Sequence, residues 1–149
     1  MVVKFTVLGS PKSKGRPEFF RVKNRVGTRT PEDTVLYENL VRAMYQYSHP
    51  GVRFPDGSML DMRILAYYQI PKSVSKRKRD AMIAGELRPT KTPDADNIIK
   101  VVADSLNKIA YRDDAQIVDT QIRKFYSDRP RVEVTIRDIP TQIERGIQS

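Results

Sequence analysis

Apolar and polar residues recur along this chain with two periods, one typical of strands and the other of helices. A period of two indicates a half-buried strand, whereas apolar residues at i, i+3, i+4 and i+7 indicate an amphipathic helix. The first pattern predicts strands over residues 2–8, 59–70, 116–126 and 131–138. The second predicts helices over residues 31–47, 73–85 and 97–109.

Turn and capping residues add detail near the N-terminus. Thr30 is expected to cap the first helix, with Pro31 at its first position. Breakers interrupt the basic segment 11–30, in which the aromatic residues Phe19 and Phe20 indicate a loose hairpin.

The order of these elements, β-α-β-α-α-β-β, predicts an α/β (α+β) fold in which helices flank a mixed β-sheet. No internal repeat divides the chain, so residues 1–149 are expected to form a single domain, with a core over about 3–138 and a frayed tail over 139–149. The last two strands are separated by a short turn and are expected to pair as a hairpin. A chain of this length buries about two-thirds of its unfolded surface and needs no disulfides to hold a core.

Composition excludes several classes of site. The chain has no cysteine, which excludes disulfides and thiolate metal sites, and its one histidine, His49, leaves no room for a multi-histidine cluster. No run of about 18 apolar residues indicates a membrane span. The N-terminus has the pattern of a strand and not of a signal peptide. We therefore expect a soluble cytoplasmic protein that does not associate with membranes.

Charge is unevenly distributed along the chain, whose formal net charge is +9. Basic residues outnumber acidic ones in segments 1–30 and 72–91, whereas segment 94–119 carries six aspartates. A basic surface is typical of a protein that binds a polyanion, although an ordinary soluble protein can also have a basic isoelectric point. An acidic cluster between two basic arms indicates a place where a polyanion meets divalent cations.

The acidic segment has a spacing that gathers carboxylates. Pro93 is expected to keep the approach to the third helix extended, and in an extended chain two residues two apart, such as Asp94 and Asp96, point the same way. Asp96, Lys100 and Asp104 then fall at i, i+4 and i+8, on one stripe of the helix.

Two further acids, Asp113 and Asp114, follow in a loop that can fold back toward this helix. Carboxylates without histidine or cysteine favour a hard cation, Mg²⁺ or Mn²⁺. Such a site suits phosphodiester hydrolysis, with Lys100 placed to stabilise charge on the phosphate. A structural interpretation stays open, in which Asp96 caps the helix, Lys100 forms an ion pair and the two later acids form a polar turn.

A longer motif surrounds these residues. It reads Pro93-Asp94-Ala95-Asp96-Asn97-x-x-Lys100-x-x-x-Asp104-x-Leu106-Asn107, followed by Tyr111-x-Asp113-Asp114-x-Gln116-Ile117. The motif resembles the signature of the RusA family, small endonucleases that resolve Holliday junctions and are often carried by phages or prophages. The resemblance covers roughly residues 3–138 and includes the segments 13–17, 70–73, 75–79 and 130–134.

The resemblance implies roles for individual residues. Metal-binding aspartates would be Asp94, Asp96 and Asp114, with Asp113 as a neighbour that can share the role of Asp114, and Lys100 would be the catalytic lysine. Two more residues of the motif, Asn97 and Asp104, would lie beside these ligands, and Asp104 can equally be a structural partner of a lysine. The family also implies a homodimer that uses Mg²⁺, with Mn²⁺ as a substitute.

Together these features predict a Mg²⁺-dependent endodeoxyribonuclease that resolves Holliday junctions by symmetric nicking in DNA recombination and repair. Contacts with the four-way junction are expected from basic side chains, namely Lys12, Lys14, Arg16, Lys72, Lys76, Arg77, Lys78 and Arg79. For Phe19, Phe20 and Tyr111 we expect core packing, with stacking on unpaired bases as the alternative. Alternative functions are a non-catalytic DNA-binding recombination accessory protein, and a flap or branched-DNA nuclease with the same acidic site.

Overall fold

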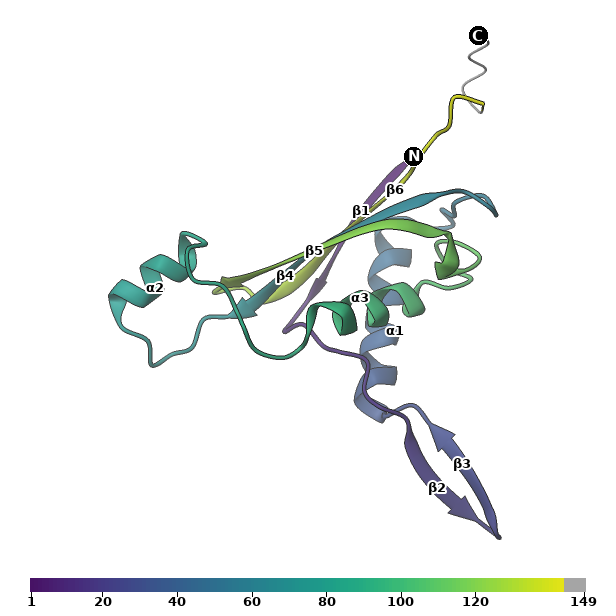
Figure 1. Ribbon diagram of the computed structural model, residues 1–149, viewed down its shortest axis with the longest axis horizontal. Helices are drawn as coiled ribbons and strands as arrows, with labels where there is room; N and C mark the ends of the chain where they lie inside the picture. Colours follow the sequence, from purple (N-terminus) through teal and green to yellow (C-terminus); the bar gives the residue numbers. More distant parts are fainter. Residues whose placement is uncertain (144–149) are drawn as a thin grey trace.

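The computed structural model describes residues 1–143 and contains a mixed four-stranded sheet (Figure 1). The strands lie in the order β1-β6-β4-β5, in which β6 is antiparallel to both β1 and β4, and β5 is parallel to β4. Their bounds are β1 Val2–Leu8, β4 Leu60–Gln69, β5 Ile117–Ser127 and β6 Arg131–Asp138. The prediction of an α+β fold with a mixed sheet is confirmed.

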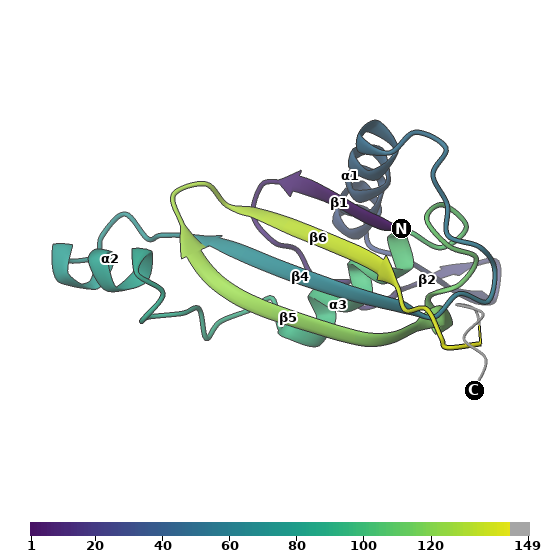
Figure 2. The same cartoon turned by 90° about the horizontal axis from the view of Figure 1, so that it is seen from above.

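Two helices cover one face of this sheet, and two further elements extend away from it (Figures 1 and 2). The covering helices are α1 Glu32–Ser48 and α3 Ala95–Ser105. A short 3-10 helix, η1 Asp114–Gln116, precedes β5. The outlying elements are the helix α2 Lys76–Ile83 and a hairpin formed by β2 Glu18–Val22 and β3 Arg25–Arg29.

The core lies between the sheet and the two covering helices. Alternate residues of β1, β4 and β6 point into it, because side chains alternate between the faces of a strand. From the helices, Tyr37, Val41 and Tyr45 of α1 meet Ile98 and Val102 of α3. Because both helices pack on this core, the first and last turns of α3 are held in fixed positions, and these turns carry the acidic residues.

The expected hairpin of the last two strands is wrong. β5 and β6 do not pair, because β4 lies between them. Two strand spacings amount to about 9.6 Å, and the chain from Ser127 to Arg131 can span about 13 Å, so the turn is long enough to cross the end of β4. β4 takes the central place because its inward side chains, such as Met62 and Ile64, are fully buried, whereas β5 has the exposed pattern of an edge strand.

Two local expectations for α1 are also wrong. Its N-cap is Pro31 and not Thr30, and no side chain caps it. The helix over 31–47 was expected to face the core with the apolar residues whose spacing predicts it. These residues, Val35, Leu36, Leu40, Met44 and Tyr47, are instead largely solvent-exposed, and only Met44 packs against the core. A different stripe of α1, in which the rings of Tyr37 and Tyr45 are buried, faces the core instead.

Candidate active site

An acidic cluster forms where the chain leaves α3 and folds back on it. The Tyr111 hydroxyl donates a hydrogen bond to the carbonyl oxygen of Ala103 at 2.7 Å, which fixes this turn against the helix. Beyond the turn, the backbone N–H of Asp114 donates to Asn107 Oδ1 at 2.8 Å. These two contacts bring the Asp114 carboxyl within hydrogen-bonding reach of the Asp104 carboxyl, in the last turn of α3.

Lys14 completes this cluster. Its Nζ lies 2.6 Å from Asp104 Oδ2 in a partly buried ion pair, and the hydrogen bond with Asp104 raises the pKa of Lys14. Burial opposes ionisation of Asp104, but the hydrogen bond from Lys14 helps to lower its pKa below the usual value. Burial and the neighbouring carboxyls of Asp104 and Asp113 together raise the pKa of Asp114 to about 6. The cluster therefore holds one ionised acid paired with lysine and one acid that ionises only above about pH 6.

Asp113 has a different role from its neighbour. Its side chain accepts a hydrogen bond from the Ala115 backbone N–H at 2.8 Å and forms a capping box with Gln116. That backbone hydrogen bond, together with a side-chain hydrogen bond from Asp114, lowers the pKa of Asp113. The structure thus uses Asp113 as the cap of η1 and places Asp114 against the acid on α3.

The other two predicted acids lie at the opposite end of α3. The helix begins at Ala95, so Asp94 is the N-cap and Asp96 lies in the first helical turn. The expectation that both lie in an extended stretch is wrong for Asp96, as is the alternative that Asp96 caps the helix. The carboxylate of Asp94 makes no capping hydrogen bond, and both acids are exposed.

Hydrogen bonds from β4 and β5 fix the chain just before Asp94. The Tyr68 hydroxyl donates to the carbonyl oxygen of Pro93, and the Lys124 Nζ donates to the carbonyl oxygen of Lys91 at 2.7 Å. Burial, with the negative charge of Asp94 as a smaller cause, raises the pKa of Tyr68 to about 12, so the hydroxyl stays a donor. The start of α3 is therefore held in place by the sheet.

Lys100 lies between the two ends of α3, on the same helical stripe as Asp96 and Asp104. Eight residues of helix separate those acids by about 12 Å along the axis. Among residues 1–143, Lys100 forms no ion pair or hydrogen bond, and its side chain is exposed. Its charge contributes to the lowered pKa of Asp104, so the ammonium acts on the cluster through space.

The aspartates at the two ends of α3 are the type of ligand that a hard cation prefers, but their side chains are not gathered around one point. The donors are carboxylates and the amide of Asn107, all oxygen ligands that Mg²⁺ prefers. Two of the carboxyls are held in contact, which raises the pKa of one of them. Nevertheless, no three Asp, Glu or His side chains within residues 1–143 converge to form a metal site. Asn97, which was expected beside the ligands, is half-buried in the first turn of α3.

The predicted DNA-contacting residues fall into two groups. Two of them are engaged within the protein, since Lys14 pairs with Asp104 and Arg79 of α2 pairs with Asp128 at the β5–β6 turn. The others have exposed side chains, namely Lys12, Arg16, Lys72, Lys76, Arg77 and Lys78.

The three aromatic residues differ in burial. Tyr111 is fully buried, as core packing predicts, whereas Phe19 and Phe20 are exposed and the expectation of core packing is wrong for them.

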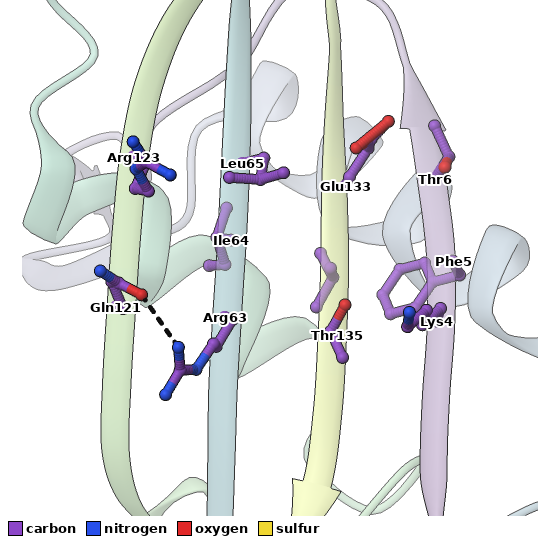
Figure 3. A pocket seen from close by; sticks show the side chains of 11 residues that line it. Lys4, Phe5, Thr6, Arg63, Ile64, Leu65, Gln121, Arg123, Glu133 and Thr135 are labelled. Carbon is purple, nitrogen blue, oxygen red and sulfur yellow. Dashed lines mark hydrogen bonds between the residues drawn. The ribbon is translucent and has the colours of Figure 1, made fainter.

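A shallow hollow of about 570 Å³ lies on the sheet face that the helices leave open (Figure 3). All four strands contribute side chains to it, and Arg63 donates to Gln121 Oε1 across its floor at 3.2 Å. Asp61 on the same face is buried, with Arg63 and Arg137 as partners. Because α3 lies on the other face, this hollow is not part of the acidic site.

No helix within residues 1–143 is long and apolar enough to cross a membrane.

The sequence did not indicate the part that three residues play in the acidic cluster. Lys14, which was expected to contact DNA, is 90 residues from its acidic partner Asp104, and no local pattern signals their contact. Asn107 and Tyr111 stand in the motif, where their spacing from Asp114 could have indicated a turn that orients it.

Two comparisons with known proteins place the chain in a family. The chain is 39% identical over 139 residues to an uncharacterized protein of Bacillus subtilis (strain 168), YqaN, a match that covers 92% of this chain and 96% of the relative. The model of the family described as endodeoxyribonuclease RusA matches residues 9–137, a segment that includes Lys14, all of α3 and the acidic turn. The chain therefore belongs to the RusA endodeoxyribonuclease family, and its biochemical class is that of a nuclease acting on DNA.

Proposed function

We propose that this protein is a Mg²⁺-dependent endonuclease that resolves Holliday junctions by symmetric nicking, as a homodimer in the bacterial cytoplasm. The observation that carries the proposal is the acidic stripe of α3, which ends in the contact of Asp104 with Asp114 and is flanked by exposed basic arms. Membership of the RusA family supports the class of reaction.

In this proposal Asp94 and Asp96 at the start of α3 and Asp114 beyond its end would supply the carboxylates that hold Mg²⁺, or Mn²⁺ in its place, so one ion would take ligands from both ends of the helix. Asp113 would remain the cap of η1. The metal would supply an activated water and would neutralise charge on the scissile phosphate. Other parts of the mechanism belong to the chain itself. The Asp104–Lys14 pair holds Asp114 in position, and the exposed Lys100 ammonium is free to meet negative charge that develops on the phosphate.

DNA contact would come from side chains with no competing partner. Three exposed cations of α2, Lys76, Arg77 and Lys78, lie on a helix that buries only Met82. A helix with so little apolar contact is not held by packing, so its density of cations favours phosphate binding.

The outer stripe of α1 supports a homodimer. Leu36, Leu40 and Tyr47 are 60%, 39% and 83% exposed and, with Ala43, recur at i, i+4, i+7 and i+11. An exposed apolar stripe with this spacing is typical of a helix that packs against another helix. Two active sites related by a two-fold axis would also suit paired nicks. If the stripe is the interface, Leu36→Asp halves the molecular mass measured by light scattering.

A panel of labelled substrates tests the activity. Four-way junctions, forks, flaps and linear duplexes are incubated with the protein in Mg²⁺, with Asp96→Asn as the control. We expect paired nicks in the junction, none with Asp96→Asn, and unimpaired junction binding by that variant. Preferred cutting of flaps would indicate the branched-DNA nuclease instead, and binding without metal-dependent cutting would indicate the accessory protein.

A further inference from the structure

The β2–β3 hairpin stands away from the rest of the protein (Figure 1). Every residue of β2 and all but Gly27 of β3 are exposed. The tip turns through Lys23 and Asn24, both with positive φ, as a tight two-residue hairpin requires. A two-stranded ribbon with no core of its own is marginally stable, so its apolar surface is not explained by folding of the domain.

The two phenylalanines of the hairpin point to opposite faces. The Phe20 ring lies across Gly27 of the partner strand, so closely that a Cβ on that glycine would come within 2.5 Å of it. Phe19 has no such cover and is 78% exposed. On its face the register also places Val26, which is 64% exposed, beside Arg21. One face therefore presents an uncovered ring next to a cation.

Charge indicates what this face contacts. Glu18, the hairpin's one acid, is paired with Arg29, which leaves Arg21, Lys23 and Arg25 without an ion pair among residues 1–143. An uncharged apolar partner would satisfy the ring but would leave the three cations of these 5-residue strands without counter-charges. Unpaired bases satisfy both, because they stack on aromatic rings while their phosphates pair with cations.

The base of the hairpin is attached to the acidic cluster. Lys14 pairs with Asp104, and the next residue, Gly15, donates its backbone N–H to the buried Thr34 Oγ1 at 2.9 Å. A Cβ at Gly15 would lie 2.9 Å from both Thr34 and Pro31, so the backbone is pressed against α1. Because only Arg16 and Pro17 separate this anchor from β2, DNA seated on the hairpin is also close to the acids.

We infer that the β2–β3 hairpin reads the branch point, with the Phe19 ring stacked on a base that the crossover leaves unpaired. The inference rests on the proposed function and adds to it a contact with unpaired bases, distinct from the phosphate contacts of α2.

The test uses the absence of tryptophan from the chain. Phe19→Trp introduces one tryptophan, whose emission can be excited apart from that of the seven tyrosines, and Val26→Trp places a tryptophan on the same face as a matched control. Both are titrated without Mg²⁺ with a four-way junction and with a linear duplex of equal length. We expect the junction to quench Phe19→Trp strongly, and the duplex to leave it nearly unchanged. Phe19→Ala should bind the junction about 5- to 150-fold more weakly, the range for loss of one stacked base, and the duplex equally well.

Two results would overturn the inference while leaving the proposed function intact. One is normal junction affinity of Phe19→Ala in a protein whose wild type nicks junctions. The other is a change in molecular mass of Phe19→Ala, which would show that the ring covers a second copy of the chain. Failure of the wild type to prefer junctions over duplexes would overturn both the inference and the proposed function.

Discussion

Asp114→Asn should stabilise the protein at neutral pH, because it removes a carboxylate that the fold disfavours. In the folded protein the pKa of Asp114 is raised from 3.8 to about 6. A folded-state pKa above the unfolded one adds stability below about pH 4, and that stability is lost as the pH rises through about 6. Wild type therefore loses stability over this interval, whereas asparagine, which resembles the neutral acid, does not.

The difference between 3.8 and about 6 corresponds to about 3 kcal/mol. Asp114 is only partly buried, so solvent screening reduces the expected effect to about 1 kcal/mol. For a chain of 149 residues this raises the melting temperature by about 3 °C. Thermal unfolding followed by circular dichroism, in EDTA at pH 4, 6 and 8, measures it. We expect equal stabilities at pH 4 and a growing advantage of the variant toward pH 8.

The neighbouring acid supplies a control with the same change of charge. The pKa of Asp113 is lowered, first by the Ala115 backbone N–H, so its ionised form contributes stability that is present above the unfolded pKa. Asp113→Asn should therefore give no gain at pH 8. If the melting temperature of Asp114→Asn at pH 8 is no higher than that of wild type, or if both variants gain equally, the fold does not disfavour the carboxylate of Asp114 in particular.

Three further predictions concern lysines and arginines. Lys100→Met should keep normal junction affinity and melting temperature but cut about 10²–10³-fold more slowly in single-turnover assays; early melting with normal cutting would show a structural role. Replacing Lys76–Arg79 by alanine should reduce the slope of log K against log salt by up to about 0.9 for each lost phosphate contact, and an unchanged slope would place α2 away from DNA. Lys14→Met should lower the melting temperature at pH 7, and this loss should shrink as the pH falls through the lowered pKa of Asp104 and the carboxylate is protonated; a loss that does not change with pH would refute the ion pair.

Periodicity predicted most elements but not their pairing. The strands over 2–8 and 131–138 were correct because apolar side chains alternate along each of them. Strand order depends on contacts between segments that are far apart in the chain, and the alternation of apolar residues within one strand does not show these contacts. Adjacent strands joined by a short turn therefore looked like a hairpin.

The chemistry of the site could be predicted, whereas its geometry could not. The motif identified the acids of α3 and the acidic turn because their spacing is local. Contacts between distant segments have no such signal, so the pairing of Lys14 with Asp104 required the fold. Phe19 was assigned to the core because aromatic residues usually lie there. Its exposure follows from a hairpin too short to cover its own faces.

The acidic turn opposes the stability of the helix on which it is built. The negative end of a helix dipole disfavours anions, yet Asp104 lies in the last turn of α3 and the turn brings Asp114 against it. Lys14 offsets the charge of one of these acids but not both. A turn selected for stability alone would place a cation here. This cluster of acids costs stability, yet buried Tyr111 fixes the turn that carries Asp114, and Lys100 is left without an ion pair among residues 1–143. Such a combination is typical of a site kept for chemistry.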